Sequence, residues 1–381
     1  MVKNSTGKKK ILFVEYFPLT GGGQVVLAQL IKKLKKDYDV NLLILNKGPI
    51  TGFLNEQKIK YDFIQAPKSV KFRYLPGMLG FERKLLSYLA DKEPDLISAN
   101  CYFAAKLCVF PAGIRKIPVI WHKHITIEKK YFSYLSSQIR FYSRFVKKII
   151  CVSEAVKETM KKAGVKEEKL AVVHNGVELP DKTFKRSGTE TRKRHGVKDS
   201  EFLVGAVGFL RKNKGFELFI DAAGIVVRKK KNIRFMIAGS AEKGDEEYAA
   251  RLKKRAENLN LGKKFIFAGH RDRYEYMPAF DLLCVPSYNE PFGMVTIEAS
   301  ALGVPAIAFN TGGSKEIITH KKNGFLAGKT DAASLAAGIL EAEKDRERLG
   351  KISRAAAENV KDNFTLEKQA AEIRGIIEKA V

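Results

Sequence analysis

The sequence predicts an α/β protein of two domains, each with a parallel sheet. The chain has 381 residues, which is too long for one typical hydrophobic core and suits two domains of ordinary size. Short apolar runs of strand length alternate with stretches of helical spacing, which is typical of parallel sheets covered by helices. A polar stretch rich in Lys, Thr, Arg and Asp interrupts this pattern at residues 179–200, near the middle of the chain.

Short apolar runs mark the expected strands. In the first half they are residues 10–15, 41–45, 96–99, 119–121, 148–152 and 170–173. In the second half they are residues 202–207, 234–238, 264–268, 282–285 and 306–309. We therefore expect an N-terminal Rossmann-like domain, a linker, a C-terminal Rossmann-like domain and a final amphipathic helix, at residues 1–180, 181–200, 201–365 and 366–381.

The net charge of +27 is concentrated in the first half. Residues 1–180 carry 32 Lys and Arg against 15 Asp and Glu, a net charge of +17. The excess is highest at residues 101–150, where basic and aromatic side chains alternate and Glu128 is the single acid. Residues 71–84 have a similar composition. We expect an anionic membrane surface or an anionic acceptor as partner, with a solvated basic face and nucleic-acid binding as the alternatives.

The remaining composition indicates a cytoplasmic protein. No apolar run is long enough to span a bilayer, and residues 1–10 lack a signal-peptide core. The four cysteines lie in apolar surroundings without the spacing of metal ligands, so we expect reduced, buried thiols.

Two glutamates carry the strongest functional signal. Glu290 and Glu298 stand eight residues apart, between a predicted strand and a helix that ends at Gly303. A helix N-terminus attracts phosphate through its free amides and its dipole, while carboxylates accept hydrogen bonds from sugar hydroxyls. The combination suits a nucleotide sugar, although surface glutamates on an ordinary strand-helix unit are the alternative.

This segment resembles the signature of the retaining glycosyltransferases of family 4, with Phe292 and Gly293 between the glutamates and Pro305 after them. The resemblance implies the GT-B fold, in which two Rossmann-like domains with parallel sheets face each other across a cleft. It also implies that Glu298 holds the ribose hydroxyls. The transferred sugar is then held by Glu290 together with backbone amides at Phe292, Gly293, Met294 and Val295.

The first domain contains two further matches to this family. A glycine loop at residues 21–23 precedes a helical pattern, and the resemblance places Gly22 and Gly23 against the distal phosphate and the sugar of the donor. Two histidines follow the strand at 119–121. His124 matches the histidine that contacts the donor sugar, and His122 is the second candidate. A flexible turn and a structural histidine are the alternatives.

The second domain opens with a match to the family's phosphate-binding turn. Lys214 fits the phosphate-binding lysine, but Phe209 stands where most members have an arginine. Arg211 or Arg271 would then replace that arginine. Farther along, the resemblance places the nucleotide base on backbone groups at Gly269, His270 and Arg271.

The resemblance implies a hexosyltransferase that needs no cofactor and no metal. The donor is a nucleotide-diphosphate sugar, with UDP as the first expectation and GDP as the second. The sequence Asp37-Tyr38-Asp39 is explained by a turn rather than by a metal site. A front-face reaction, in which the leaving phosphate helps to deprotonate the acceptor, is implied by the resemblance, and Glu290 as a nucleophile is the alternative.

For the acceptor we expect a lipid-linked or membrane-associated molecule of glycan or glycolipid biosynthesis, such as cell-surface polysaccharide, on the inner face of the membrane. A soluble sugar acceptor is the alternative. A nucleic-acid-binding protein and a non-catalytic nucleotide-binding module are less favoured, because no nucleic-acid motif accompanies the charge and both glutamates are present. The resemblance also implies that the helix at 366–381 crosses back to the first domain, while a helix that stays on the second domain fits the pattern equally well.

Overall fold

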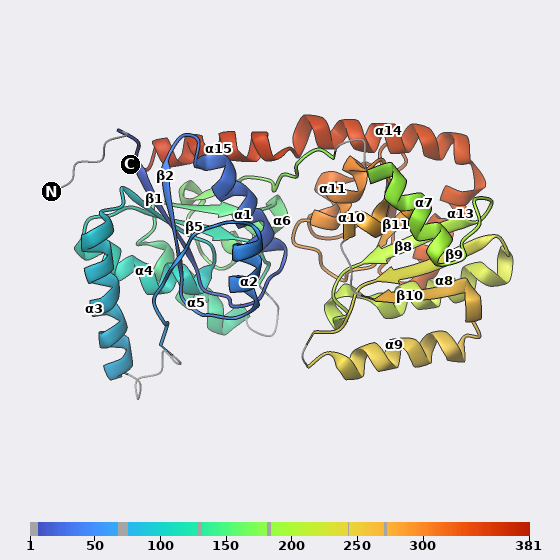
Figure 1. Cartoon of the computed structure of the whole chain (residues 1–381), viewed down its shortest axis with the longest axis horizontal. Coiled ribbons are helices and arrows are strands. Elements are labelled where there is room, and N and C mark those ends of the chain that lie inside the picture. Colours follow the sequence, from blue (N-terminus) through green and yellow to red (C-terminus); the bar gives the residue numbers. More distant parts are fainter. Residues whose placement is uncertain (1–6, 68–74, 128–131, 181–183, 243, 270–272) are drawn as a thin grey trace. The chain divides into compact units, whose positions relative to one another are not determined.

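The computed structural model describes residues 7–67, 75–127, 132–180, 184–242, 244–269 and 273–381 (Figure 1). The chain divides into two compact units. The first contains Met1–Gly176 together with Leu366–Val381, and the second contains Val177–Thr365.

The first unit is built on a parallel sheet of seven strands in the order β3-β2-β1-β4-β5-β6-β7. The strands are β1 (Lys10–Glu15), β2 (Asp39–Ile44), β3 (Asp62–Phe63), β4 (Leu96–Ala99), β5 (Val119–Lys123), β6 (Lys148–Cys151) and β7 (Leu170–Val172). All except the two-residue β3 correspond to predicted strands. The strand order reverses between β1 and β4, and ligands of open α/β sheets bind at the carboxyl ends of strands beside such a reversal.

Helices connect these strands. They are α1 (Gly22–Leu34), α2 (Pro49–Glu56), α3 (Leu75–Lys92), α4 (Tyr102–Ile114), α5 (Phe132–Ser143) and α6 (Glu154–Lys162), with a 3-10 turn, η3, at Glu167–Lys169. The core beside β1 combines Ile11 and Phe13 of the strand with Leu27, Leu30 and Ile31 of α1. The helical spacing of these apolar residues is the reason that α1 covers the sheet.

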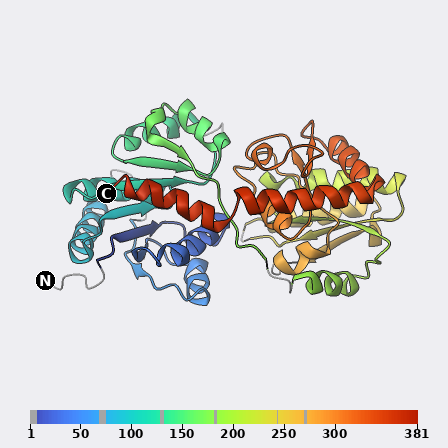
Figure 2. The ribbon, with the colours of Figure 1, turned by 90° about the horizontal axis from the view of Figure 1, so that it is seen from above.

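The last helix, α15 (Leu366–Glu378), belongs to the first unit. Ala370, Ile373 and Ile377 are buried in the same core as α1, and Figure 2 shows the helix lying across this unit. Its polar side chains bind the unit as well, since Arg374 pairs with Asp37 and the Tyr38 hydroxyl donates to Glu378 at 2.6 Å. Asp37 is therefore engaged by α15.

The second unit has a parallel sheet of six strands in the order β10-β9-β8-β11-β12-β13. The strands are β8 (Phe202–Val207), β9 (Ile233–Ala238), β10 (Phe265–Gly269), β11 (Leu282–Val285), β12 (Ala306–Phe309) and β13 (Phe325–Ala327). Only β13 had not been predicted. The longer helices are α7 (Phe184–Arg194), α8 (Phe216–Lys229), α9 (Glu246–Asn258), α11 (Met294–Ala301), α13 (Ala332–Lys344) and α14 (Arg346–Asn363). The short ones are η4 (Lys212–Lys214), η5 (Gly262–Lys264), α10 (Arg273–Tyr276), η6 (Met277–Ala279) and α12 (Ser314–Ile317).

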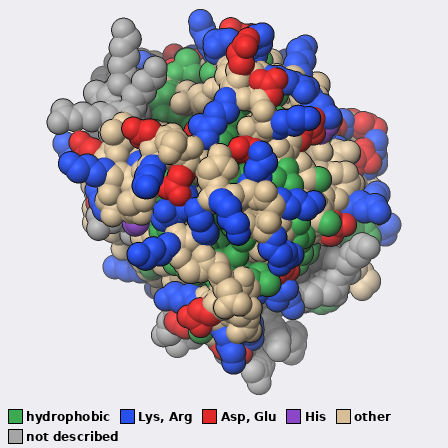
Figure 3. All heavy atoms as spheres, turned by 90° about the vertical axis from the view of Figure 1, so that its right-hand side faces the viewer, with side chains coloured by type: hydrophobic (Ala, Val, Ile, Leu, Met, Phe, Trp, Pro, Cys, Tyr) green, Lys and Arg blue, Asp and Glu red, His purple; other side chains and the backbone are tan. Residues whose placement is uncertain are grey.

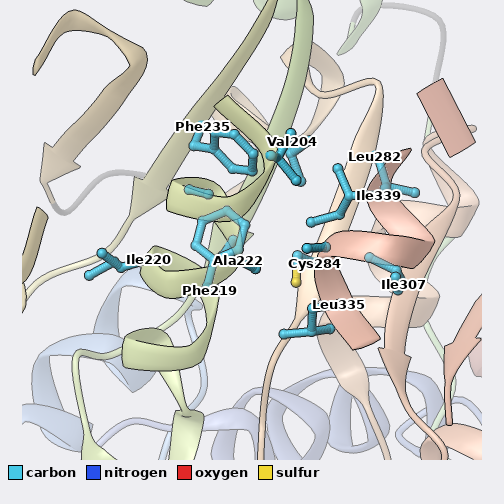
Figure 4. Packing of buried hydrophobic residues seen from close by; sticks show 14 of the residues in the cluster. Val204, Phe219, Ile220, Ala222, Phe235, Leu282, Cys284, Ile307, Leu335 and Ile339 are labelled. Atoms are coloured by element: carbon cyan, nitrogen blue, oxygen red, sulfur yellow. The ribbon is translucent and has the colours of Figure 1, made fainter. Parts of the chain in front are cut away.

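The core of the second unit lies between its sheet and the helices α8 and α13. Phe219 of α8 and Leu335 of α13 pack against strand residues that include Phe235 and Cys284 (Figure 4). Cys284 carries a free thiol inside this core, in agreement with the prediction of reduced cysteines. The other three cysteines are also free, and Cys101 is the one that is only partly buried.

The interpretation of residues 181–200 as a linker was wrong for most of that stretch. Residues 184–194 form α7, which is part of the second unit. Arg192 holds it there, with its guanidinium donating to Asp281 at 2.6 Å and to the backbone oxygen of Ala279 at 2.8 Å. The polar composition of the helix reflects the side that faces solvent, and the half-buried contacts of Arg192 could not be read from it.

Candidate active site

The loop between β11 and α11 places Glu290 at the carboxyl end of the second sheet. Gly293 precedes the helix with φ of 118°, a left-handed conformation that favours glycine. The loop after β12 packs closely against the Glu290 backbone. The Gly313 amide donates to the backbone oxygen of Glu290 at 2.8 Å. A Cβ atom on Gly312 would lie 2.2 Å from the same backbone oxygen. The glycines therefore fix the position of Glu290.

Lys214 reaches Glu290 from the loop between β8 and α8. The Lys214 Nζ lies 2.9 Å from Glu290 Oε2, and the two side chains are 32% and 12% exposed. Gly215 follows with φ of 64°, and a Cβ there would lie 2.1 Å from the backbone oxygen of Pro286. Because glycine lets these loops approach, the predicted phosphate-binding lysine and the first glutamate of the pair meet at one place.

The start of α11 adds backbone donors to this place. The first amides of a helix have no partner within it, and at α11 these belong to Met294 and Val295, whose residues are half-buried. Phe292 is 3% exposed and packs edge-on against Phe364, with ring centroids 5.9 Å apart. The Phe292 side chain is therefore part of the packing. Glu298 lies in the second turn of α11 and is 1% exposed.

Arg211, one of the two residues expected to replace the missing arginine, is engaged by two carboxylates. The guanidinium forms ion pairs with Glu242 and with Asp245, the latter at 3.2 Å, and lies over the ring of Phe209. Two carboxylates already neutralise this cation, so it adds little positive charge for a diphosphate. Sequence spacing could not reveal these partners, which are more than 30 residues away.

The predicted base-binding segment is only partly described. Gly269 ends β10 with φ of 76°, and a side chain there would meet no other atom within 4 Å. Gly269 is exposed and lies at the carboxyl end of the strand. His270 and Arg271 lie outside the described residues.

In the first unit, His124 and the glycine loop come together. Gly22 begins α1, and a Cβ on Gly23 would lie 3.5 Å from the His124 ring. His122 instead points into the interior, where it is 5% exposed and its Nε2 lies 2.9 Å from Ser98 Oγ. His124, and not His122, is therefore the histidine at the glycine loop.

Burial, together with the smaller effect of the Lys123 charge, lowers the pKa of His124 to about 4. Burial also lowers the pKa of His122 to about 3 and that of Lys123 to about 8. Both imidazoles are neutral near pH 7, so His124 acts there as a neutral hydrogen-bonding group and not as a cation.

Sequence reasoning missed three polar residues of this site, Glu15, Asn100 and Lys123. Glu15 ends β1 and Asn100 follows β4, so both lie where the strand order reverses. Glu15 is 1% exposed and Asn100 is 3% exposed. Glu15 could have been identified from the sequence, because it is a lone carboxylate at the end of a mostly apolar strand.

Among the described residues, His, Cys, Asp and Glu form no group of three or more that could hold a metal ion. No described helix is both long enough and apolar enough to cross a membrane.

Two family models match the chain, one for each half. Residues 20–180 match Glycosyltransferase Family 4, and residues 187–359 match Glycosyl transferases group 1.

The chain is also similar to individual proteins. It is 23% identical to the UDP-Gal:alpha-D-GlcNAc-diphosphoundecaprenol alpha-1,3-galactosyltransferase of Escherichia coli, with 98% of each protein covered. It is 28% identical to the lipopolysaccharide core biosynthesis mannosyltransferase LpsB of Rhizobium meliloti, where the match spans 50% of this chain and 55% of that relative.

Among solved structures, Anabaena HepE in complex with UDP and glucose matches with a TM-score of 0.85 and 24% identity, covering 97% of this chain and 99% of the other. This likeness confirms the predicted GT-B fold of two Rossmann-like domains with parallel sheets.

Proposed function

Because the chain belongs to the glycosyltransferases of group 1 and family 4, we propose that it is a hexosyltransferase, which transfers a sugar from a nucleotide-diphosphate sugar with retention of configuration and without a metal ion. The observation that carries the proposal is the pairing of Lys214 with Glu290 beside the N-terminus of α11. A cation and free helix amides suit a diphosphate, and a carboxylate suits sugar hydroxyls.

In this proposal each residue has one task. Lys214 and the amides of Met294 and Val295 balance the charge that develops on the leaving diphosphate. Glu290 binds the transferred sugar, Glu298 binds the ribose, and His124 binds the sugar with a neutral imidazole. We propose UDP as the nucleotide, since one similar protein carries UDP-Gal in its name and another was solved with UDP.

For retention we propose a front-face reaction. The bond from the anomeric carbon to the phosphate oxygen breaks, the acceptor oxygen bonds to the same face, and the acceptor proton moves to the leaving phosphate. The ion pair with Lys214 supports this route over a covalent one, because a neighbouring ammonium group reduces the nucleophilicity of the Glu290 carboxylate.

Incubation with UDP-, GDP- and ADP-sugars in the presence of EDTA tests the donor proposal. We expect nucleotide release from one donor class, UDP-sugars first, at a rate that EDTA does not change. Release that depends on an added divalent ion would contradict the metal-independent mechanism. If no donor is turned over and no nucleotide raises the melting temperature, the assignment of the donor site is wrong.

For the acceptor we propose a lipid-linked molecule, reached at an anionic membrane. Three phenylalanines of α4 and α5 and the turn that follows are unusually exposed, with Phe110, Phe141 and Phe145 at 42%, 44% and 46%. Their ring centroids lie 5.2 to 6.5 Å apart. We call these three residues the aromatic patch.

Basic side chains adjoin the aromatic patch. A cavity of about 600 Å³ beside Phe145 is lined by Lys116, Arg144, Lys147 and Lys169, with Asp95 as the acidic side chain among them. On the face that Figure 3 shows, Lys and Arg are spread widely over the surface, with Asp and Glu among them. Aromatic rings beside several cations fit the interface of an anionic bilayer.

Replacing all three residues of the aromatic patch by serine should weaken binding to phosphatidylglycerol vesicles at least about tenfold, because each buried ring contributes on the order of 1 kcal/mol or more. Vesicle sedimentation measures this, with and without 1 M salt. Leu179→Ser is the control, since Leu179 is exposed to a similar degree, 47%, but lies in the second unit. Equal binding of the wild type to neutral and anionic vesicles, or no binding to either, contradicts the proposal and favours a soluble acceptor.

A further inference from the structure

A buried chain of hydrogen bonds connects β1 to His124 in the first unit. Asn100 Nδ2 donates to Glu15 Oε2 at 2.5 Å, and Asn100 Oδ1 lies 2.9 Å from His124 Nε2. Glu15 also accepts from the Phe17 amide at 2.7 Å and from Gln24 Nε2 at 3.2 Å. Burial raises the pKa of the Glu15 carboxyl, while these three donors favour its ionised form. The contacts join the carboxyl ends of β1, β4 and β5 with the start of α1.

The chemistry of these groups fixes the direction of every bond. Glu15 Oε2 accepts from Asn100 Nδ2, so the amide oxygen of Asn100 is the atom turned toward the histidine. That oxygen in turn only accepts, so His124 Nε2 must carry the proton. Gln24 also donates to Glu15 and does not accept from it, because the Gln24 oxygen already accepts from the Gly21 amide at 3.0 Å.

The other ring nitrogen of His124 then carries a lone pair. His124 Nδ1 is buried and has no hydrogen-bond partner among the described residues. The ring packs against the glycine loop, with its Cγ, Cδ2 and Nδ1 atoms 3.5, 3.6 and 3.8 Å from the position of a Cβ on Gly23. A buried acceptor without a protein partner at such a loop suits a ligand that donates a hydrogen bond.

We propose that Glu15 is a positioning residue, which acts through Asn100 to hold His124 as the neutral Nε2–H tautomer, so that Nδ1 accepts a hydrogen bond from a hydroxyl group of the ligand. The identity of that ligand as a sugar rests on the proposed function. The tautomer does not, because Glu15 and Asn100 set it in the ligand-free protein. The low pKa of His124 agrees with a ring that stays neutral.

Nitrogen NMR of the full-length protein with ¹⁵N-labelled histidine tests the proposal, since the two ring nitrogens report directly which one carries the proton. We expect the Nε2–H form for His124 at pH 7, assigned by the loss of its signals in His124→Gln. His320 is an internal control, because its Nδ1 accepts from the Leu326 amide at 3.0 Å. A wild-type His124 in the Nδ1–H or the doubly protonated form overturns the proposal without any further variant.

Glu15→Gln then tests the cause. Glutamine both donates and accepts, so Asn100 becomes able to turn its NH₂ group toward His124, and we expect a substantial population of the Nδ1–H tautomer while His320 is unchanged. An unchanged His124 tautomer in a folded Glu15→Gln variant contradicts the role of Glu15.

The double variant Glu15→Gln with Asn100→Asp restores the order, since the new amide at position 15 donates to the new carboxylate at position 100, and that carboxylate accepts from the histidine. We expect the Nε2–H tautomer to return and the pKa of His124 to rise, because a carboxylate now adjoins a ring that has Lys123 and His122 as titratable neighbours. If the tautomer does not return, the relay through Asn100 is wrong. If the tautomers behave as expected but no sugar donor is turned over, only the proposed function fails.

Discussion

Replacement of Lys214 by methionine is expected to lower donor turnover about 100- to 1,000-fold, the usual cost of removing one preorganised group that stabilises charge in a transition state. Methionine keeps much of the length of the side chain and removes the ammonium group. The leaving diphosphate then lacks the positive charge of Lys214. Arg211 supplies little compensation, because it is already paired with Glu242 and Asp245.

The matched control for this variant is Lys212→Met, in the same short turn. Lys212 is exposed, whereas Lys214 is half-buried and contacts Glu290. We expect Lys212→Met to retain the wild-type rate of nucleotide release and the same melting temperature. Similar rates for the two variants, or a Lys214→Met protein that loses affinity for UDP but not turnover, contradict the assignment of Lys214 to the leaving group.

Much of the fold could be predicted because the interior strands of both sheets are mostly apolar, as β8 (FLVGAV) and β11 (LLCV) are. The edge strand β3 has two residues, too few for any pattern, and it was missed. The helix α7 was missed for a different reason. Its sequence, FKRSGTETRKR, is almost entirely polar, and the contacts that hold it, from Arg192 to Asp281 and Ala279, are made with residues 87 to 89 positions away.

In the candidate site, too, some features follow from local sequence patterns and others from contacts between distant residues. Lys214 and Glu290 were each predicted from local motifs, and the structure brings them together across 76 positions. The pairing of Arg211 with Glu242 and Asp245, and the chain from Glu15 to His124, depend on groups whose meeting is set only by the folded sheets. Local motifs therefore identify which residues have suitable chemistry, while tertiary contacts decide which of them are available to a ligand.

Glu298→Gln is expected to weaken UDP binding about 10- to 100-fold, because a hydrogen bond to a charged group contributes roughly 1.5 to 3 kcal/mol and every 1.4 kcal/mol is a factor of about ten in affinity. Glutamine has the same shape but replaces one carboxylate oxygen by a donor, so it cannot accept from both ribose hydroxyls. Isothermal titration with UDP measures the effect, and thermal unfolding measured on the same samples reports stability.

Stability and binding must be separated here, because Glu298 is 1% exposed and a carboxylate so deeply buried could also serve only the fold. Glu343→Gln is the control for a buried carboxylate of the same unit. Glu343 is 8% exposed, lies 3.2 Å from Lys230 Nζ and accepts from Asn232 at 3.3 Å. We expect Glu343→Gln to lower the melting temperature and leave UDP affinity unchanged, and Glu298→Gln to do the reverse. If Glu298→Gln instead behaves like Glu343→Gln, Glu298 supports the helix α11 and the ribose hydroxyls are bound elsewhere.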